Sequence, residues 1–198
     1  MLNRFRRALG PLLDGIGSFF AKSGISPNFW TLVSLLFAVA SGLTYMSPLL
    51  AAGIGWYYPS LAGSIMLLIS GFFDIVDGSV ARTLKQSSKK GAFLDSILDK
   101  ISESLIFIGI AVGGLASPLF CQVAISLSLM VSYARSRSES MGIELKGVGI
   151  GERAERLLSV GFLGLIPLED SLQYAVLLVC VLAGITLCQR IIFSIHRL

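Results

Sequence analysis

The chain has 198 residues, of which 54% are hydrophobic and only 14% are charged, and its mean hydropathy is +0.79. Soluble domains of this size carry roughly a quarter charged residues, so the composition excludes an ordinary soluble protein and predicts a membrane protein. The formal net charge of +4 is modest. It gives little reason to expect nucleic-acid binding and is compatible with contact to anionic lipid headgroups.

The chain offers few of the side chains on which many hydrolases and transferases rely. Its cysteines form no Cys-x-x-Cys pair and lie in apolar runs, so we interpret them as small buried hydrophobic residues: Cys121, Cys180 and Cys188. His196 is the single histidine. A histidine-rich zinc site and a Ser-His-Asp triad are therefore excluded. Any transfer chemistry must rest on carboxylates, arginines and an added metal ion.

Residues 1–25 are predicted to form an amphipathic helix that lies in the cytoplasmic interface of the membrane. Apolar side chains recur there at helical spacing, at Leu9, Leu12, Leu13, Ile16, Phe19 and Phe20. Basic residues precede them at Arg4, Arg6 and Arg7. Because Pro11, Asp14 and Lys22 interrupt the stretch, it lacks the apolar core of a cleaved signal peptide.

Six apolar stretches are long enough to cross a hydrocarbon core of about 30 Å. They cover residues 28–47, 57–77, 91–113, 117–138, 153–168 and 171–193. If both termini are cytoplasmic, the outer loops carry no Lys or Arg and only two acids, Glu169 and Asp170, as the positive-inside rule requires. We therefore predict one all-α integral domain in the cell membrane over residues 1–198, with a six-helix transmembrane bundle over 26–198.

Acidic residues gather where the second and third predicted spans meet the cytoplasm. Asp74 and Asp77 differ by roughly 60° around their helix, and Asp95 and Asp99 by roughly 40°, so each pair faces one way. If the two helices pack as neighbours, the four carboxylates converge. Such a group requires divalent cations, and we predict Mg²⁺ or Mn²⁺, with two ions suited to holding a diphosphate.

Small residues and one arginine accompany these acids. Gly78 follows Asp77, and Gly91 precedes Asp95 by one turn, so both lie on the acidic faces and allow a bulky ligand to approach the backbone. Ala81 has a small side chain, so the helix surface between Asp77 and Arg82 does not obstruct a ligand. Arg82, one turn beyond Gly78, has the planar fork of donors that suits a phosphate oxygen.

These residues resemble the signature of the CDP-alcohol phosphatidyltransferase family at every position. The match is Asp74-x-x-Asp77-Gly78-x-x-Ala81-Arg82, then eight residues, then Gly91-x-x-x-Asp95-x-x-x-Asp99. Ser26-Pro27-Asn28 and Thr31 are similar to that family's entry into its first span, and six spans are its usual architecture.

The resemblance implies transfer of a phosphatidyl-type group from a CDP-linked lipid to an alcohol, with release of CMP. Asp74, Asp77 and Asp95 would hold metal, and Asp99 would complete the cluster and act as general base. The CDP site would comprise Asp74, Asp77, Gly78, Ala81, Arg82 and Gly91, with Asn28 and Thr31 either touching the nucleotide or capping the first span. A homodimer is implied by the resemblance alone.

A basic group in the second half of the chain bears on the acceptor. Arg135, Arg156 and Arg190 either anchor helix ends in the interface or form a pocket for a second, dianionic phosphate. The segments 132–139 and 151–156 and the pair Gln189-Arg190 resemble the branch of the family that uses inositol phosphate, the archaetidylinositol phosphate and phosphatidylinositol phosphate synthases. That resemblance implies that the three arginines form a phosphate pocket and that soluble inositol phosphate is the acceptor.

Neighbouring charges have plainer interpretations. Arg137 and Arg153 are predicted to end helices or to pair with Glu139 and Glu155. Glu103, one turn after Asp99, either supports the acidic group or pairs with a buried base.

Two other functions compete with this prediction. Glycerol phosphate is also a phosphomonoester and would use the same arginines, whereas free inositol or serine would leave their charge unmatched. A divalent cation transporter would place acids deep in several spans.

An apolar groove accepts ether-linked isoprenoid and ester-linked acyl tails alike, so both donors remain open.

Overall fold

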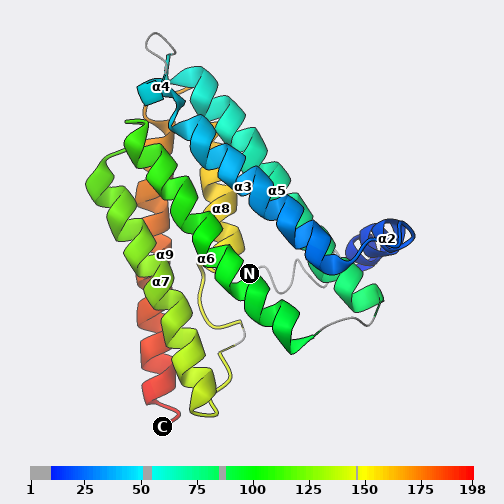
Figure 1. Cartoon of the computed structure of the whole chain (residues 1–198). Coiled ribbons are helices and arrows are strands. Elements are labelled where there is room, and N and C mark those ends of the chain that lie inside the picture. The colour runs from blue at the N-terminus through cyan, green and yellow to red at the C-terminus, as the bar shows by residue number, and fades with distance from the viewer. Residues whose placement is uncertain (1–9, 51–54, 85–87, 146) are drawn as a thin grey trace.

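The computed structural model describes residues 10–50, 55–84, 88–145 and 147–198. Across these ranges every regular element is a helix (Figure 1): α2 (Gly10–Ala21), α3 (Pro27–Tyr45), α4 (Ser47–Leu50), α5 (Tyr57–Thr83), α6 (Lys89–Val112), α7 (Pro118–Ser140), α8 (Arg153–Gly164) and α9 (Ser171–Ile195). The predicted all-α class is confirmed. Leu9 and the arginines at 4, 6 and 7 lie outside the described residues.

Six helices pack as a closed ring in the order α3, α5, α8, α9, α7, α6 and back to α3. Figure 1 shows α2 outside this ring, projecting from the end of α3 and α5. The ring differs from the predicted packing in one respect: α3 lies between α5 and α6, so these two helices are not a closely packed hairpin. The acids of α5 and α6 therefore face one another across the ring instead of along a shared helix interface.

Four helices are long and apolar enough to span a membrane by length and composition: α3, α5, α7 and α9. The other two members of the ring do not meet that description. α6 has 24 residues, but its first half carries charged side chains. α8 has only 12 residues, about 18 Å at 1.5 Å per residue, which is shorter than a hydrocarbon core. The predicted span 153–168 is thus helical only as far as Gly164.

Small residues let α3 approach α6 closely. A Cβ atom at Gly42 would lie 2.9 Å from the carbonyl oxygen of Leu105, and one at Gly109 would overlap the carbonyl of Gly42. Gly113 meets the carbonyl of Tyr45 in the same way. In lipid the hydrophobic effect does not drive helices together. Small residues favour tight packing instead, because backbones that lie close gain dispersion contacts. These glycines are what allow α3 to lie between α5 and α6.

Hydroxyl groups add hydrogen bonds between helices in the same region. Ser34 Oγ donates to the Ser70 carbonyl and Ser70 Oγ donates to the Ser34 carbonyl, each at 2.9 Å, which joins α3 to α5. Ser60 Oγ donates to the Gly164 carbonyl at 3.0 Å and joins α5 to α8. Buried hydroxyls of this kind stabilise helix contacts in membranes by about 0.6–2 kcal/mol each.

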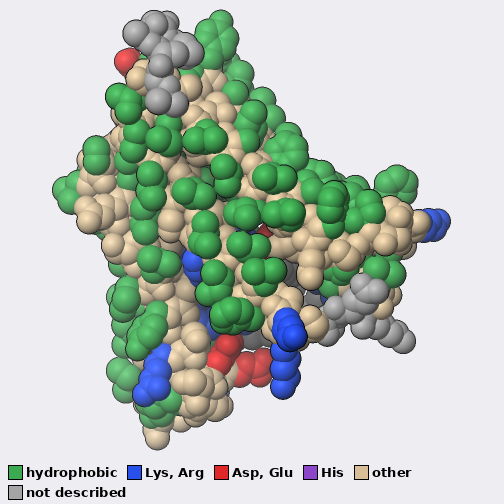
Figure 2. Space-filling model, viewed as in Figure 1, with side chains coloured by type: hydrophobic (Ala, Val, Ile, Leu, Met, Phe, Trp, Pro, Cys, Tyr) green, Lys and Arg blue, Asp and Glu red, His purple; other side chains and the backbone are tan. Residues whose placement is uncertain are grey.

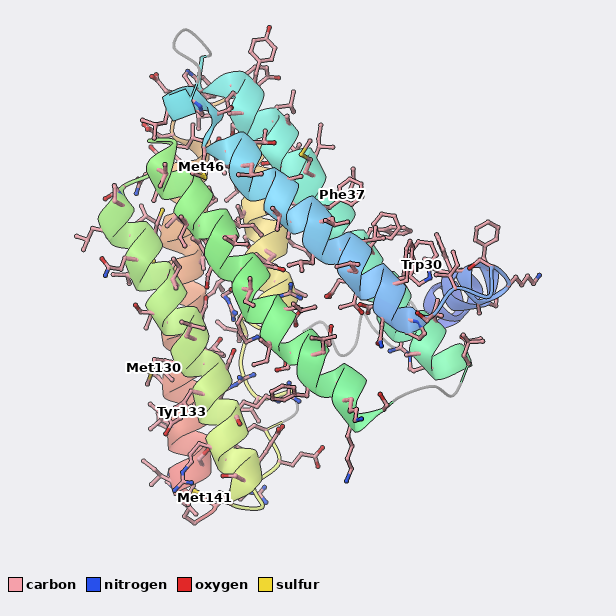
Figure 3. All side chains as sticks on the ribbon, viewed as in Figure 1. Trp30, Phe37, Met46, Met130, Tyr133 and Met141 are labelled. Atoms are coloured by element: carbon pink, nitrogen blue, oxygen red, sulfur yellow. The ribbon has the colours of Figure 1, made fainter. Side chains whose placement is uncertain are left out.

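The exterior of the ring is largely apolar, as a lipid-facing surface requires. Figure 2 shows hydrophobic side chains over most of the visible face, with Lys and Arg at the right-hand tip and in the lower part of the view. Met130 and Tyr133 on α7 point outward in Figure 3, and their exposed fractions are 47% and 61%.

Of the cysteines, only Cys121 is buried, so the interpretation of Cys188, which is exposed on α9, as a buried residue is wrong.

Aromatic contacts attach α2 to the ring. The rings of Phe20 and Trp30 meet edge to face at 5.0 Å, and Trp30 stacks on Phe73 at 5.7 Å. Figure 3 shows Trp30 where α3 meets α2. Gly17 allows the close approach, because a Cβ there would lie 3.0 Å from the Ser79 carbonyl of α5. A helix therefore forms within the predicted segment 1–25 and packs on α5 near the acidic signature.

We expect Gly109→Ala to lower the midpoint of thermal unfolding in detergent, followed by circular dichroism. The added Cβ would meet the carbonyl of Gly42, and overpacking of this kind costs about 1–3 kcal/mol. Gly71→Ala is the matched control, since nothing lies within 4 Å of its Cβ position, and alanine there favours the helix by about 0.5–1 kcal/mol. Equal midpoints for the two variants would contradict the close packing of α3 on α6.

Candidate active site

The acidic signature lies on two helices, α5 and α6, whose bounds are set by different local features. α5 continues to Thr83, beyond the predicted end of its span at residue 77, so Asp74, Asp77 and Arg82 share one unbroken helix. α6 begins after Ser88, whose side chain accepts a hydrogen bond from the Gly91 backbone at 3.0 Å. This cap fixes the start of the helix that carries Asp95 and Asp99.

Three of the four predicted metal ligands converge. Carboxylate oxygens of Asp74, Asp95 and Asp99 all lie within 4.8 Å of one another. Asp77 is outside this group, yet it lines the same cavity, is only 7% exposed, and its Oδ2 has no hydrogen-bond partner among the described residues. Clustered carboxylates and a buried oxygen without a donor are the surroundings that a hard divalent cation requires. The residues therefore fit the predicted metal.

Arg153 joins two members of the acidic group. Its Nη1 atom lies 3.0 Å from Asp74 Oδ1 and 2.7 Å from Asp99 Oδ1. Arg153 is the first residue of α8, and a capping box fixes that helix start, with the Glu152 backbone donating to Glu155 Oε2 at 2.7 Å. The prediction that Arg153 forms an ion pair is thus confirmed, but Glu155 as its partner is wrong, because Glu155 caps α8.

A cavity of about 730 Å³ contains the acidic group and the basic group together. This volume falls within the usual range for small-molecule and cofactor sites. Its walls come from α5, α6, α7, α8 and α9, and the predicted site residues among them are Asp74, Asp77, Gly78, Arg82, Asp95, Asp99, Arg135, Arg156 and Arg190. The structure thus places the candidate donor and acceptor sites in one space.

Four predicted site residues are not among those that line the cavity: Asn28, Thr31, Ala81 and Gly91. Thr31 donates a hydrogen bond to the Pro27 carbonyl at 3.3 Å. Gly91 lies at the start of α6 beside α3, where its Cβ position is 3.5 Å from Asn28 Oδ1. By contrast, among the described residues the only atom within 4 Å of a Cβ at Gly78 is Arg82 Nη1, at 3.4 Å, so this glycine leaves the cavity wall open.

Arg156 is the most buried of the three predicted acceptor residues, with an exposed fraction of 1%. Its Nε and Nη2 atoms donate to the two carboxylate oxygens of Glu103 at 2.9 and 3.1 Å, and its Nη1 donates to the Gly151 carbonyl at 2.7 Å. Of the two interpretations left open for Glu103, the structure shows the buried ion pair. Two Nη hydrogens of Arg156 remain for a ligand.

Arg190 and Arg135 hold their places by different contacts. Arg190 on α9 is 4% exposed and donates to the carbonyls of Val148 and Val131 at 3.0 and 2.8 Å. Arg135 on α7 is more open and pairs with Glu139 at 2.8 Å. Of the two interpretations of Arg137, the structure shows a residue in the last turn of α7, and Glu139 pairs with Arg135 instead. Residues four apart share one face of a helix, whereas Arg137 and Glu139 are only two apart and point in different directions.

The segment before α8 lies against α9 beside these arginines. Val148 and Gly151 give their carbonyl oxygens to Arg190 and Arg156, and the Gly151 backbone donates to Thr186 Oγ1 at 2.8 Å. Gly149 has a φ of 121°, a conformation that favours glycine. The segment is therefore held on α9 by hydrogen bonds at both ends of the turn.

Sequence reasoning missed the contact of Arg153 with the acidic group. A signal was present, because Arg153 and Arg156 are three residues apart and lie roughly 60° apart on one helix face. The spacing does not reveal that α8 crosses α5 and α6. That crossing brings Arg153 to Asp74 and Asp99.

We expect Glu103→Ala to lower the thermal unfolding midpoint strongly. Breaking a buried ion pair leaves an uncompensated charge and costs about 3–5 kcal/mol. Glu139→Ala is the control, because the Arg135–Glu139 pair is 45% and 42% exposed and surface pairs contribute about 0–1 kcal/mol. A midpoint for Glu103→Ala as high as that of the control would contradict the role of the buried pair.

Comparisons with known proteins agree with this geometry. Residues 24–195 match the family model described as CDP-alcohol phosphatidyltransferase. The chain is 36% identical to the archaetidylinositol phosphate synthase of Methanothermobacter thermautotrophicus, covering 100% of this chain and 96% of that protein. It is 34% identical to the phosphatidylinositol phosphate synthase of Streptomyces avermitilis, covering 97% and 82%.

The fold is also similar to solved structures. The crystal structure of Mycobacterium tuberculosis phosphatidylinositol phosphate synthase with CDP-DAG bound has a TM-score of 0.76 at 24% identity and covers 93% of this chain and 94% of that one. A second structure of that protein, in complex with manganese and citrate, has a TM-score of 0.74 and covers 92% and 88%. With the four aspartates of its signature around one cavity and its family match over nearly the whole length, the chain belongs to the CDP-alcohol phosphatidyltransferase family.

Proposed function

We propose that this protein transfers the archaetidyl or phosphatidyl group of a CDP-linked lipid to a hydroxyl of inositol phosphate and releases CMP. One observation carries the proposal: the acidic group and all three acceptor arginines line a single cavity. A diphosphate and a phosphomonoester both need positive counter-charge, and the cavity has one place suited to a metal and another rich in guanidinium groups. The names of the relatives support the same reaction.

Divalent metal is part of this proposal, as Mg²⁺ or Mn²⁺ and with two ions. Asp74, Asp77, Asp95 and Asp99 would hold it, and a solved relative contains manganese. The metal would neutralise the diphosphate and stabilise the charge that develops as the bond to CMP breaks. For the CDP moiety we propose Gly78, Ala81, Arg82 and Gly91, together with Asn28 and Thr31 at the start of α3.

Asp99 is the proposed general base. Its carboxylate would accept the proton of the attacking inositol hydroxyl, whose oxygen forms a bond to the phosphorus that carries the lipid. The bond from that phosphorus to the bridging oxygen breaks, and CMP leaves with the oxygen and its electron pair. Asp99 lines the same cavity as the acceptor arginines, which supports the proposal that an acceptor bound by them presents its hydroxyl to Asp99.

The acceptor site is proposed to comprise Arg135, Arg156 and Arg190. Arg156 and Arg190 are nearly buried and held by protein acceptors, so they are pre-organised at little further entropic cost on binding. Glycerol phosphate is the alternative acceptor, because it carries the same charged group. Inositol phosphate is preferred on the resemblance of the segments around these arginines and on the names of the relatives.

The membrane arrangement is proposed as six spans, formed by the six helices of the ring, α3, α5, α6, α7, α8 and α9. The charged first turn of α8 and the charged first half of α6 line the cavity. We propose that α2 lies in the cytoplasmic interface, that both termini are cytoplasmic in the cell membrane, and that the protein is a homodimer. The donor enters sideways from the lipid and the acceptor from the cytoplasm.

Purified protein in detergent, given Mg²⁺ and a CDP-linked lipid, should release CMP with inositol phosphate. Glycerol phosphate, free inositol and serine should support much less release, because they fit the cavity less well or leave the arginines unmatched. Both archaeal-type and acyl donors belong in the assay. Preference for glycerol phosphate would support the transfer reaction and contradict inositol phosphate as the acceptor. Absence of CMP release with every acceptor would favour the divalent cation transporter.

Asp99→Asn should lower kcat for CMP release by about 10²–10⁴-fold, since the amide cannot accept the proton. Asp170→Asn is the control: it changes an exposed acid at the start of α9, away from the cavity. Unfolding midpoints of both variants show whether the fold is intact. A kcat within a few-fold of the control would contradict the role of Asp99.

Arg190→Ala should raise KM for inositol phosphate by on the order of tenfold to a hundredfold, with a smaller change in kcat. Because Arg190 also holds two backbone carbonyls, the exposed Arg135→Ala provides a second variant whose loss disturbs little else. Arg137→Ala, on an exposed turn of the same helix, is the control. Unchanged acceptor KM in both variants would contradict the pocket.

A further inference from the structure

Arg153 occupies two of the carboxylates that the metal would use. One nitrogen, Nη1, contacts both Asp74 Oδ1 and Asp99 Oδ1, at 3.0 and 2.7 Å. This nitrogen donates a hydrogen bond to Asp74 Oδ1, and its contact with Asp99 Oδ1 is an ion pair. Asp95, the third member of the carboxylate group, is not bridged by Arg153. The guanidinium therefore neutralises part of the group and leaves part of it free.

The position of Arg153 is built into the fold. The capping box of Glu152 and Glu155 sets the start of α8, and the side chain of Arg153 is 17% exposed. Its Nε atom is buried without a hydrogen-bond partner among the described residues. In the part of the chain that the structure describes, the ion-pair partners of this guanidinium are Asp74 and Asp99, so its direct contacts depend on these two carboxylates.

We propose that Arg153 is a positioning residue that acts as the resident counter-ion of Asp74 and Asp99 and competes with the divalent cation for them. This inference rests on the metal site proposed above. Without metal, Arg153 holds the carboxylates of α5 and α6 near one another against their mutual repulsion. When metal binds, the same oxygens carry the cation, and Arg153 gives up at least one of its contacts.

The proposed competition predicts in which direction the metal affinity changes when Arg153 is removed. A unit positive charge beside a cation site opposes cation binding, and the effect is large where water is scarce. Removing Arg153 should therefore tighten metal binding, although it destabilises the metal-free protein. A residue with a merely structural role would lower stability without raising affinity for the metal.

The test measures Mn²⁺ binding by the electron paramagnetic resonance signal of free Mn²⁺, with purified full-length protein in detergent. Arg153→Gln should lower the Kd for Mn²⁺ by on the order of tenfold and lower the unfolding midpoint in EDTA. Arg137→Gln removes the same charge from an exposed position outside the cavity and should bind Mn²⁺ as the unmodified protein does. An unchanged or higher Kd in Arg153→Gln overturns the proposal.

A second measurement needs no variant. Phenylglyoxal modifies accessible arginines, and mass spectrometry reports each site separately. Saturating Mn²⁺ should raise the modification rate of Arg153, because the guanidinium leaves its carboxylate partners, while the exposed Arg137 reacts at the same rate with and without metal. A rate for Arg153 that stays constant or falls overturns the proposal even if Arg153→Gln does not fold.

The outcomes separate this inference from the proposed function. CMP release with an unchanged Mn²⁺ Kd in Arg153→Gln would leave the function standing and remove the role of Arg153. Tighter Mn²⁺ binding without CMP release from any acceptor would support the role of Arg153 and remove the function. Failure of the unmodified protein to bind Mn²⁺ would remove the role of Arg153, and CMP release with Mg²⁺ would still decide the function.

Discussion

The structure depends on the compensation of charge that is buried near the end of a helical membrane bundle. Acids at such a site are costly unless they are paired or carry a cation. Arg153 contacts Asp74 and Asp99, and Arg156 forms two hydrogen bonds to Glu103. Both arginines come from the first turn of α8, so one short helix supplies the counter-charge for two longer ones. The ring of helices, in turn, is closed through α8.

Much of the site could be predicted from spacing alone. Helical periodicity places Asp74 beside Asp77 and Asp95 beside Asp99, and this local geometry is insensitive to the rest of the fold. The all-α class followed from composition, and the bounds of α3, α7 and α9 lie within a few residues of their predicted spans. Long apolar helices are predictable because lipid fixes both their length and their hydrogen bonding.

What could not be predicted depends on contacts between distant segments. The glycines of α3 and α6 place α3 between α5 and α6, and no pattern within either helix reveals which neighbour it will meet. Arg153 was predicted to pair with Glu155, two residues away, but the capping of α8 uses that glutamate. α8 ends at Gly164 although apolar residues continue, because the chain turns there through Leu165–Leu168 before α9 begins.

The hydrogen bonds that hold the segment before α8 have a consequence for how this enzyme can diverge. Arg190 and Arg156 donate hydrogen bonds to the carbonyls of Val148 and Gly151, so two of the three proposed acceptor residues also hold the loop in place. A lysine at either position keeps the charge but cannot span a backbone carbonyl and a ligand phosphate with one planar fork. New acceptor preferences in such a scaffold should therefore arise by coordinated change of loop and arginine, not by single substitutions.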